Sequence, residues 1–185
     1  MGNDLFMAAG ATYSPCERYR YTLYRQWGAG KRALFIMLNP STATEFQLDP
    51  TVTRVLTRVS RMPDFGRFDV ANLFALRSTD PKQLYGHTDP IGPDNDLAIL
   101  QASRAADLVV CGWGNHGQYM GRALQVEANL QSAGIQLHAL RFTKAGNPEH
   151  PLYVPYTLSP RPYHRSADGY PSTLQSRLDV QGIPL

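Results

Sequence analysis

The sequence predicts an α/β protein, a three-layer sandwich in which helices cover both faces of a mostly parallel, four-stranded central sheet. The main observation is residues 33–38, six apolar residues without alternation, which are typical of a strand buried on both faces. Residues 68–72 and 107–111 are further short, mainly apolar runs. Stretches with helical periodicity lie between the runs, and alternation of strand and helix along a chain favours parallel pairing.

Length and composition set the broad class of the protein. A chain of 185 residues with 43% hydrophobic and 18% charged residues is ordinary for a soluble globular protein with a substantial core. Of its 18 basic residues, 15 are arginine, an excess that either an anionic partner or a GC-rich genome explains. Cys16 and Cys111 have no metal-site spacing, and neither a signal-peptide pattern nor a membrane-length apolar run is present. We therefore expect a cytoplasmic protein with no metal, no cofactor and no membrane partner.

The N-terminal part of the chain supplies the edge of the predicted sheet. Residues 1–15 are small and polar, and we expect a loose arm. Residues 17–27 alternate, which indicates a half-buried, antiparallel edge strand. One face of this strand would carry Tyr19, Tyr21 and Leu23, and the other Arg18, Arg20 and Thr22.

The remaining elements follow in order. Strands are predicted at 68–72, 107–111 and 135–140, and helices at 51–61, 94–105 and 118–133, the last ending at Gly134. Beyond Pro155 the composition shifts to Ser, Pro, Arg and Tyr without a sustained period. We therefore divide the chain into an α/β domain, 1–155, and an irregular tail, 156–185, with one helical turn at most near 174–178.

Polar side chains gather where the predicted strands end. Ligands of open α/β sheets bind at the carboxyl ends of the strands. An amide presents a donor and an acceptor together, and an aromatic ring offers a stacking face, so this set of side chains suits a nucleobase. The residues concerned are Asn39, Ser41 and Thr42 after the central strand, with Asp49 and Arg54 close behind, then Asn72 and Arg77, then Trp113, Asn115 and His116, and finally His150.

Two alternatives compete with this interpretation. Residues 112–117 fit Gly-x-Gly-x-x-Gly between a strand and a helix, which leaves open a dinucleotide-dependent oxidoreductase. The motif follows the third strand of the sheet, however, and the next strand ends in Arg141 rather than in an acid for a ribose hydroxyl. Asp49 also has a competing role as the N-cap of the helix that begins near Thr51.

Several of these residues belong to motifs that resemble a bacterial and phage family known as the domain of unknown function numbered 1643. The resemblance covers roughly residues 18–153 and implies no activity. The matching motifs are Met37–Ala43, Asp49–Thr51 with Arg54, Asn72–Arg77, Asp89–Gly92, Trp113–Gly114 and His150–Tyr153.

The order of the motifs also resembles the uracil-DNA glycosylase superfamily. The similar segments are Leu38–Pro40, Asn72, Trp113–Gly114 and His150–Pro151, although Leu38 stands where that superfamily has glycine. This second resemblance implies a glycosylase-like topology and a division of roles. Asn39 would position a water that Asp49 assists, Asn72 would hydrogen-bond the base edge, and His150 would stabilise charge on the departing base.

The sequence therefore predicts a nucleobase-recognising enzyme that hydrolyses an N-glycosidic bond in DNA, RNA or a nucleotide. The alternative is a non-catalytic nucleic-acid or nucleotide-binding module, with Arg18, Arg54, Arg58 and Arg77 as phosphate contacts. In the enzyme hypothesis, Asn39, Asp49 and His150 are catalytic and Arg54 and Arg58 contact phosphate. The substrate-binding residues are Ser41, Thr42, Asn72, Arg77, Trp113, Asn115 and His116.

Overall fold

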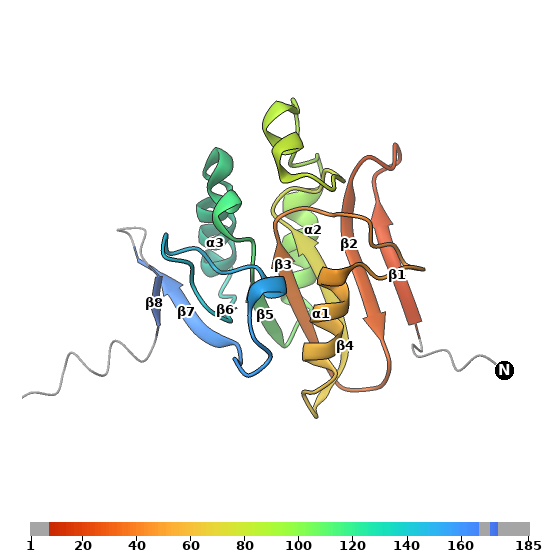
Figure 1. The fold of residues 1–185 in the computed structure, drawn as a ribbon, viewed down its shortest axis with the longest axis vertical. Coiled ribbons are helices and arrows are strands. Elements are labelled where there is room, and N and C mark those ends of the chain that lie inside the picture. The colour runs from red at the N-terminus through yellow and green to blue at the C-terminus, as the bar shows by residue number, and fades with distance from the viewer. Residues whose placement is uncertain (1–7, 167–170, 174–185) are drawn as a thin grey trace, which may run out of the picture.

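Strand β3 (Lys31–Met37) lies near the middle of an eight-stranded sheet in the computed structural model, which describes residues 8–166 and 171–173 (Figure 1). Its apolar run is buried on both faces, as predicted. Leu34 and Ile36 belong to the hydrophobic cluster on one side of the sheet, and Phe35 and Met37 to the cluster on the other. The run does not alternate because neither face of the strand meets water.

The strands lie in the order β1-β2-β4-β3-β5-β6-β7-β8. Parallel pairings join β4 to β3, β3 to β5, and β5 to β6. Antiparallel pairings add β2 and β1 at one side and β7 and β8 at the other. The remaining bounds are β1 (Ala8–Tyr13), β2 (Arg20–Gln26), β4 (Phe65–Asn72), β5 (Leu108–Cys111), β6 (Leu137–Ala139), β7 (Arg161–Arg165) and β8 (Pro171–Thr173).

The α/β class is thus confirmed, but a mostly parallel, four-stranded sheet does not describe this molecule. The sheet is twice as wide, and antiparallel pairings outnumber parallel ones. The segment predicted as the edge strand is β2, which is interior because β1 pairs with it along residues 8–13. The expectation of a loose arm is therefore wrong for those residues, while residues 1–7 lie outside the described part.

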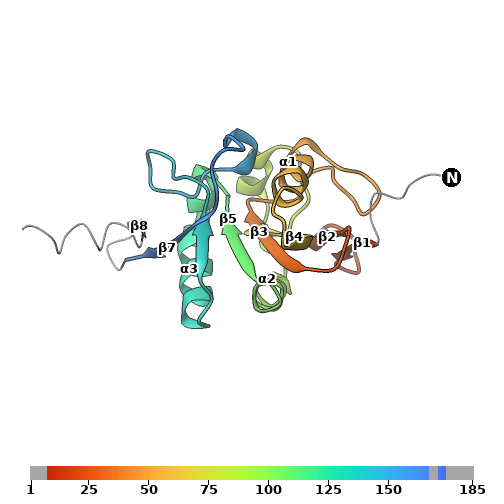
Figure 2. The same cartoon turned by 90° about the horizontal axis from the view of Figure 1, so that it is seen from below.

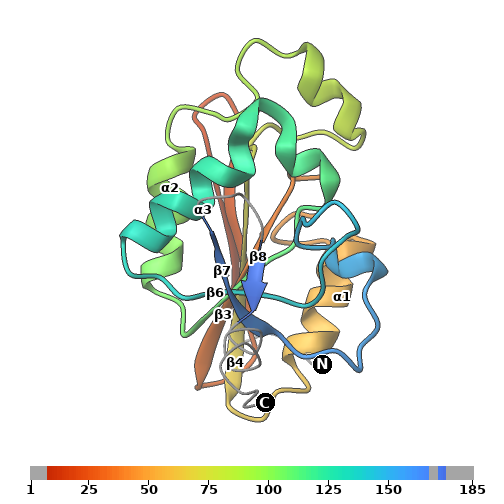
Figure 3. The same ribbon diagram turned by 90° about the vertical axis from the view of Figure 1, so that its left-hand side faces the viewer.

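The helices cover both faces of the sheet (Figures 2 and 3). Helix α1 (Pro50–Val59) lies on one face, where Val52, Val55 and Val59 join Phe35 in one cluster. Helices α2 (Asn95–Arg104) and α3 (Arg122–Ser132) lie on the opposite face, where they complete the other cluster. Three short 3-10 helices complete the list: η1 (Pro81–Gly86), η2 (Asn115–Gly121) and η3 (Pro151–Tyr153).

The helix predicted at 118–133 is shorter than expected. It begins at Arg122, and the 3-10 helix η2 precedes it. Met120 and Gly121 have positive φ angles of 56° and 66°, so an α-helix cannot run through them. At the other end, Gly134 has a φ of 77°, the left-handed conformation expected where a helix ends.

A β-bulge near the start of β2 changes which face its side chains point to. On β1, Thr12 pairs with Thr22 and the next residue, Tyr13, pairs with Arg20, so Tyr21 is an extra residue. Tyr21 therefore belongs to the cluster under α2, whereas Leu23 belongs to the cluster under α1. The predicted alternation, with both on one face, is wrong for this reason.

The tail beyond Pro155 is partly ordered into the sheet. Strand β7 pairs with β6, β8 pairs with β7, and Tyr163 is buried in the core. The prediction of an irregular tail is wrong for these two strands. The helical turn expected near 174–178 lies outside the described residues. Within the described ranges, no helix has the length and apolar character needed to cross a bilayer.

Candidate functional site

A cavity of about 530 Å³ lies at the carboxyl ends of β3, β4 and β5. The loops that follow these strands line it, together with the start of α1 and the segment around η3. Eight of the residues singled out in the sequence contribute to its lining, so the structure brings most of the predicted site together. They are Asn39, Ser41, Asp49, Asn72, Trp113, Asn115, His116 and His150.

Asn39 stands directly after β3, where Pro40 prevents the strand from continuing. Its amide nitrogen donates to the backbone carbonyls of Pro40, at 3.1 Å, and Ser78, at 2.8 Å. These two bonds fix the plane of the amide. Its Oδ1 has no hydrogen bond to another described residue, so it is available as an acceptor at the cavity wall.

Asn72 ends β4 and has an unusual environment. Its side chain is 1% exposed, yet neither its Nδ2 nor its Oδ1 has a hydrogen-bond partner in the described chain. Leaving a buried donor or acceptor unpaired costs about 1–3 kcal/mol for each group. An amide with both groups unmet, at the wall of a cavity, is therefore a strong indication of a ligand with a complementary donor and acceptor.

Trp113 also carries an unpaired polar atom. The indole is 1% exposed and lines the cavity, and its Nε1 has no partner among the described residues. A Cβ atom at Gly117 would stand 2.2 Å from Cδ1 of Trp113, so only glycine fits against this ring. Trp113 thus brings a buried indole N–H without a described partner to this side of the cavity, and its predicted stacking role stays a prediction.

His150 precedes η3, and its ring caps that helix. The ring Nδ1 accepts a hydrogen bond from the backbone N–H of Leu152 at 3.4 Å, which places the proton of the neutral ring on Nε2. Burial lowers the pKa of His150, and the negative charge of Asp49 partly opposes that shift. His150 is therefore neutral at pH 7, with Nε2–H as a donor.

Asp49 is the N-cap of α1 and also lines the cavity, so its two predicted positions are compatible with each other. Its Oδ1 accepts from the backbone N–H of Val52 at 2.7 Å, which confirms it as the N-cap of α1. It is 8% exposed and lines the cavity. Its charge also acts on the side chains of His150 and Arg20.

Asn115 and His116 form part of the exposed rim of the cavity. The Oδ1 of Asn115 accepts from Oγ1 of Thr143 at 2.7 Å and from Nδ2 of Asn147 at 3.1 Å. His116 hydrogen-bonds through Nδ1 to the hydroxyl of Tyr85 in η1. These contacts tie the loop after β5 to two neighbouring loops.

Five predicted residues lie outside the cavity lining: Arg18, Thr42, Arg54, Arg58 and Arg77. Arg58 is buried and donates to the carbonyls of Val154, Pro155 and Leu158, and Arg54 also donates to Val154. Arg77 donates to the carbonyl of Glu17, and its guanidinium lies 5.3 Å from the ring of Tyr13. These three guanidinium groups thus hold parts of the chain to one another, and their predicted roles stay predictions.

Sequence reasoning missed other residues of the site, above all Arg20. The bulge in β2 turns Arg20 toward the loop after β3, where its Nη1 donates to the carbonyl of Ala43. No local pattern identifies it, because a bulge depends on pairing with a distant strand. Ser78, Thr79, Thr143, Glu149 and Tyr153 also line the cavity.

Neither a dinucleotide nor a metal has an evident place in this arrangement. The Gly-x-Gly-x-x-Gly stretch leads into the 3-10 helix η2 rather than an α-helix, and its last glycine, Gly117, accommodates Trp113. Among the described residues, no group of three or more His, Cys, Asp or Glu side chains could hold a metal ion.

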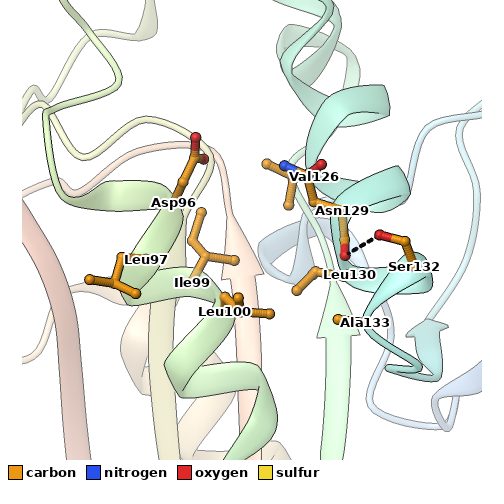
Figure 4. A pocket seen from close by; sticks show the side chains of 9 residues that line it. All are labelled: Asp96, Leu97, Ile99, Leu100, Val126, Asn129, Leu130, Ser132 and Ala133. Atoms are coloured by element: carbon orange, nitrogen blue, oxygen red, sulfur yellow. Dashed lines mark hydrogen bonds between the residues drawn. The ribbon is translucent and has the colours of Figure 1, made fainter.

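A second hollow, of about 410 Å³, lies between α2 and α3 (Figure 4). Its lining is mainly apolar and includes Ile99, Leu100 and Leu130. Asp96 at one end forms an ion pair with Arg122 at 2.5 Å. This hollow contains none of the residues singled out in the sequence, so the cavity at the strand ends is the better candidate for a functional site.

Fold and site together define an α/β protein with a partly open cavity at the carboxyl ends of parallel strands, lined by polar as well as apolar side chains. A family model described as "Protein of unknown function (DUF1643)" matches residues 20–152, and the chain belongs to this family. The match includes every residue discussed above as part of the cavity except Tyr153. Comparison with curated proteins and with solved structures finds no match.

Proposed function

We propose that the protein recognises a nucleobase in this cavity and hydrolyses the N-glycosidic bond that joins it to a sugar. The observation that carries the proposal is Asn72, whose buried amide has an unpaired donor and an unpaired acceptor at the cavity wall. A base edge offers a donor next to an acceptor and would satisfy both groups. The indole Nε1–H of Trp113 adds a second buried donor for the same ligand.

The hydrolysis needs a water molecule held near C1′ of the sugar. The Oδ1 of Asn39 is a suitable acceptor for this water because Nδ2 is occupied by two backbone carbonyls. Asp49 lines the same cavity, and its second carboxylate oxygen has no hydrogen bond to a described residue. In the proposed step the water oxygen bonds to C1′, the bond from C1′ to the base nitrogen breaks, and Asp49 takes the proton of the water.

The departing base keeps the electron pair of the broken bond and becomes negative before it gains a proton. His150 supports this stage because its neutral ring presents Nε2–H as a donor. A donor held in place before the reaction stabilises developing charge without having to reorganise. The base then takes up a proton and Asp49 releases the one that it took from the water, so that water plus N-glycoside give free base plus sugar.

The experiment is a search for released base. Nucleosides and oligonucleotides containing uracil, hypoxanthine or modified bases would be incubated with the wild type and with the Asn39→Ala, His150→Ala and Asn129→Ala variants. Asn129 is an exposed amide on α3, away from the cavity, and serves as the matched control. We expect release by wild type and Asn129→Ala, and a loss of about a hundredfold or more in the other two.

The rival hypothesis, a non-catalytic nucleic-acid or nucleotide-binding module, predicts a different result. No base would be released from any substrate, while binding would survive Asn39→Ala and weaken steeply with salt. That combination would overturn the hydrolase proposal. Arg54, Arg58 and Arg77 donate to backbone carbonyls in the folded chain. Both hypotheses use these arginines, so the release of base, and not these contacts, separates the two.

A further inference from the structure

Arg20 is the one lysine or arginine among the described residues that line the cavity. Its side chain is 2% exposed, and burial lowers its pKa to about 10, so it is still charged at neutral pH. Nη1 donates to the carbonyl of Ala43, while Nε is buried without a hydrogen-bond partner in the described chain. No carboxylate of the described residues forms an ion pair with it.

A buried cation without an ion-pair partner is costly, and the cost is offset by carbonyls, by a second charge or by a ligand. Arg58 donates to three carbonyls, whereas Arg20 donates to one. Holding the loop after β3 does not require the charge of Arg20. One neutral donor would serve the carbonyl of Ala43, and Arg25 on the same strand already holds the next carbonyl, that of Thr44. The charge of Arg20 is thus left for a negative group in the cavity.

Tyr13 and the carboxylate of Asp49 both act on Arg20 through space, and Asp49 is the carboxylate of the two. One of its oxygens is occupied as the cap of α1, whose N-terminus carries a partial positive charge. Asp49 therefore lowers the net positive charge at this side of the cavity without pairing with the guanidinium.

The position of Arg20 relative to the proposed base-binding groups indicates how a ligand would lie. Strands β2, β4, β3 and β5 are consecutive in the sheet, so the β2 side and the β5 side of the cavity are three strand spacings apart, about 14 Å. Arg20 comes from β2, Asn72 ends β4, and Trp113 follows β5. A ligand with its base between Asn72 and Trp113 would thus extend its other end toward Arg20.

We propose that the cavity binds a nucleoside monophosphate, with the base at Asn72 and the phosphate paired with Arg20. This inference rests on the proposed function and narrows its substrate to the free nucleotide. A polymer would need several phosphate contacts outside the cavity. Three of the four arginines assigned to that role, Arg54, Arg58 and Arg77, are engaged by backbone carbonyls, which leaves only Arg18 of that set.

The test measures what the phosphate adds to binding. Each of uridine, thymidine, inosine, adenosine, cytidine and guanosine would be compared with its 5′-monophosphate by titration calorimetry at fixed salt. We expect at least one base for which the monophosphate binds tenfold or more tightly than the nucleoside. In Arg20→Gln this ratio should fall close to one while nucleoside affinity is retained.

Arg25→Gln is the matched control, because Arg25 holds the same loop and does not line the cavity. The Arg25→Gln variant should keep the wild-type ratio of monophosphate affinity to nucleoside affinity. Arg20→Lys keeps a positive charge there, gives an intermediate ratio, and serves as the test should the neutral variant fail to fold. An equal fall in the ratio for the Gln variants at positions 20 and 25 would reduce Arg20 to an anchor for the loop and overturn the inference.

Three further outcomes distinguish a failure of this inference from a failure of the proposed function. Nucleosides that bind as tightly as their monophosphates would overturn the phosphate subsite and leave base recognition standing. Inorganic phosphate that raises the melting temperature of wild type but not of Arg20→Gln, without binding of any nucleoside, would support the subsite and overturn base recognition. Tight, strongly salt-dependent binding of single-stranded oligonucleotides, without binding of mononucleotides, would overturn the free-nucleotide substrate.

Discussion

The side-chain amide of Asn95 holds the main chain of Asn72 in place: its Nδ2 donates to the carbonyl of Asn72 at 3.0 Å and to that of Leu73 at 2.9 Å. Asn95 is fully buried at the start of α2, and Nε of Arg122 adds a second bond to the Leu73 carbonyl. The backbone at the end of β4 is thus firmly bonded, while the side chain of Asn72 is left unpaired. One asparagine fixes the position of the other.

The first prediction concerns Asn72→Leu. Because this substitution removes two unpaired buried polar groups at similar volume, we expect the free energy of unfolding to stay the same or rise by about 1 kcal/mol. Base release and ligand binding should be lost. Urea unfolding followed by circular dichroism measures the first effect, and a clear decrease in stability would show that the amide has partners in the folded protein.

The second prediction is the opposite behaviour of Asn95→Leu. This change leaves the carbonyl of Asn72 without the donor that it has now, and a buried unpaired group costs about 1–3 kcal/mol. We therefore expect the free energy of unfolding to fall by that amount in the same urea experiment. Equal stability of Asn95→Leu and wild type would contradict the anchoring role.

The third prediction separates the two roles of Asp49. Asparagine is as good an N-cap as aspartate, so Asp49→Asn should keep the stability of α1 while it abolishes base release. Asp49→Ala should in addition lower the free energy of unfolding by about 1 kcal/mol. Denaturation and base release would be measured on both variants, and full activity of Asp49→Asn would exclude the carboxylate as the proton acceptor.

The fourth prediction follows from the lowered pKa of His150. Between the unfolded pKa of about 6.5 and the lower folded value, the unfolded chain binds a proton that the folded chain does not. Folding stability should therefore fall as the pH drops below about 6.5, by up to about 1.4 kcal/mol per pH unit for this group. Burial also lowers the pKa of His138, so that residue contributes with the same sign.

Unfolding measured from pH 8 to pH 5 tests this dependence. His150→Gln should show a shallower loss of stability than wild type, and the His138→Gln, His150→Gln double variant a shallower one still. Identical slopes for all three proteins would show that neither ring is held neutral by the fold.

The fifth prediction concerns Arg58→Lys. The guanidinium donates to three carbonyls between Val154 and Leu158, and a lysine ammonium lacks the fork that reaches all three. We expect a loss of about 1–3 kcal/mol in the free energy of unfolding. The salt dependence of nucleotide binding should not change, and a clearly weaker dependence would support the predicted role of Arg58 as a phosphate contact.

Much of the central fold could be predicted from local pattern. The apolar run of β3, the proline that ends it, the cap of α1 at Asp49 and the glycine at position 134 all depend on neighbouring residues alone. Strands β1 and β7 were missed because their sequences have weak strand character. They are strands because a neighbouring strand offers them a ladder of hydrogen bonds.

The residues of the candidate site also divide into those that local pattern predicts and those that depend on distant contacts. Asn39, Asn72, Trp113 and His150 follow recognisable strand ends or a fixed loop, so sequence reasoning placed them at one edge of the sheet. Arg20 was missed because its direction depends on an extra residue in the pairing of β2 with β1. Arg54 and Arg58 looked available for phosphate because the sequence does not show that residues 154–158 fold back over α1.

The cavity draws its walls from five separated parts of the chain, from Arg20 on β2 to the segment around η3. No short segment of the chain can therefore form the cavity by itself. The cavity forms only after strands that are distant in the sequence have paired. Occupancy by a ligand would slow global unfolding rather than the opening of one loop. A bound nucleotide would then protect the slowest-exchanging backbone amides of β2, β3, β4 and β5 together, and hydrogen exchange can measure this protection.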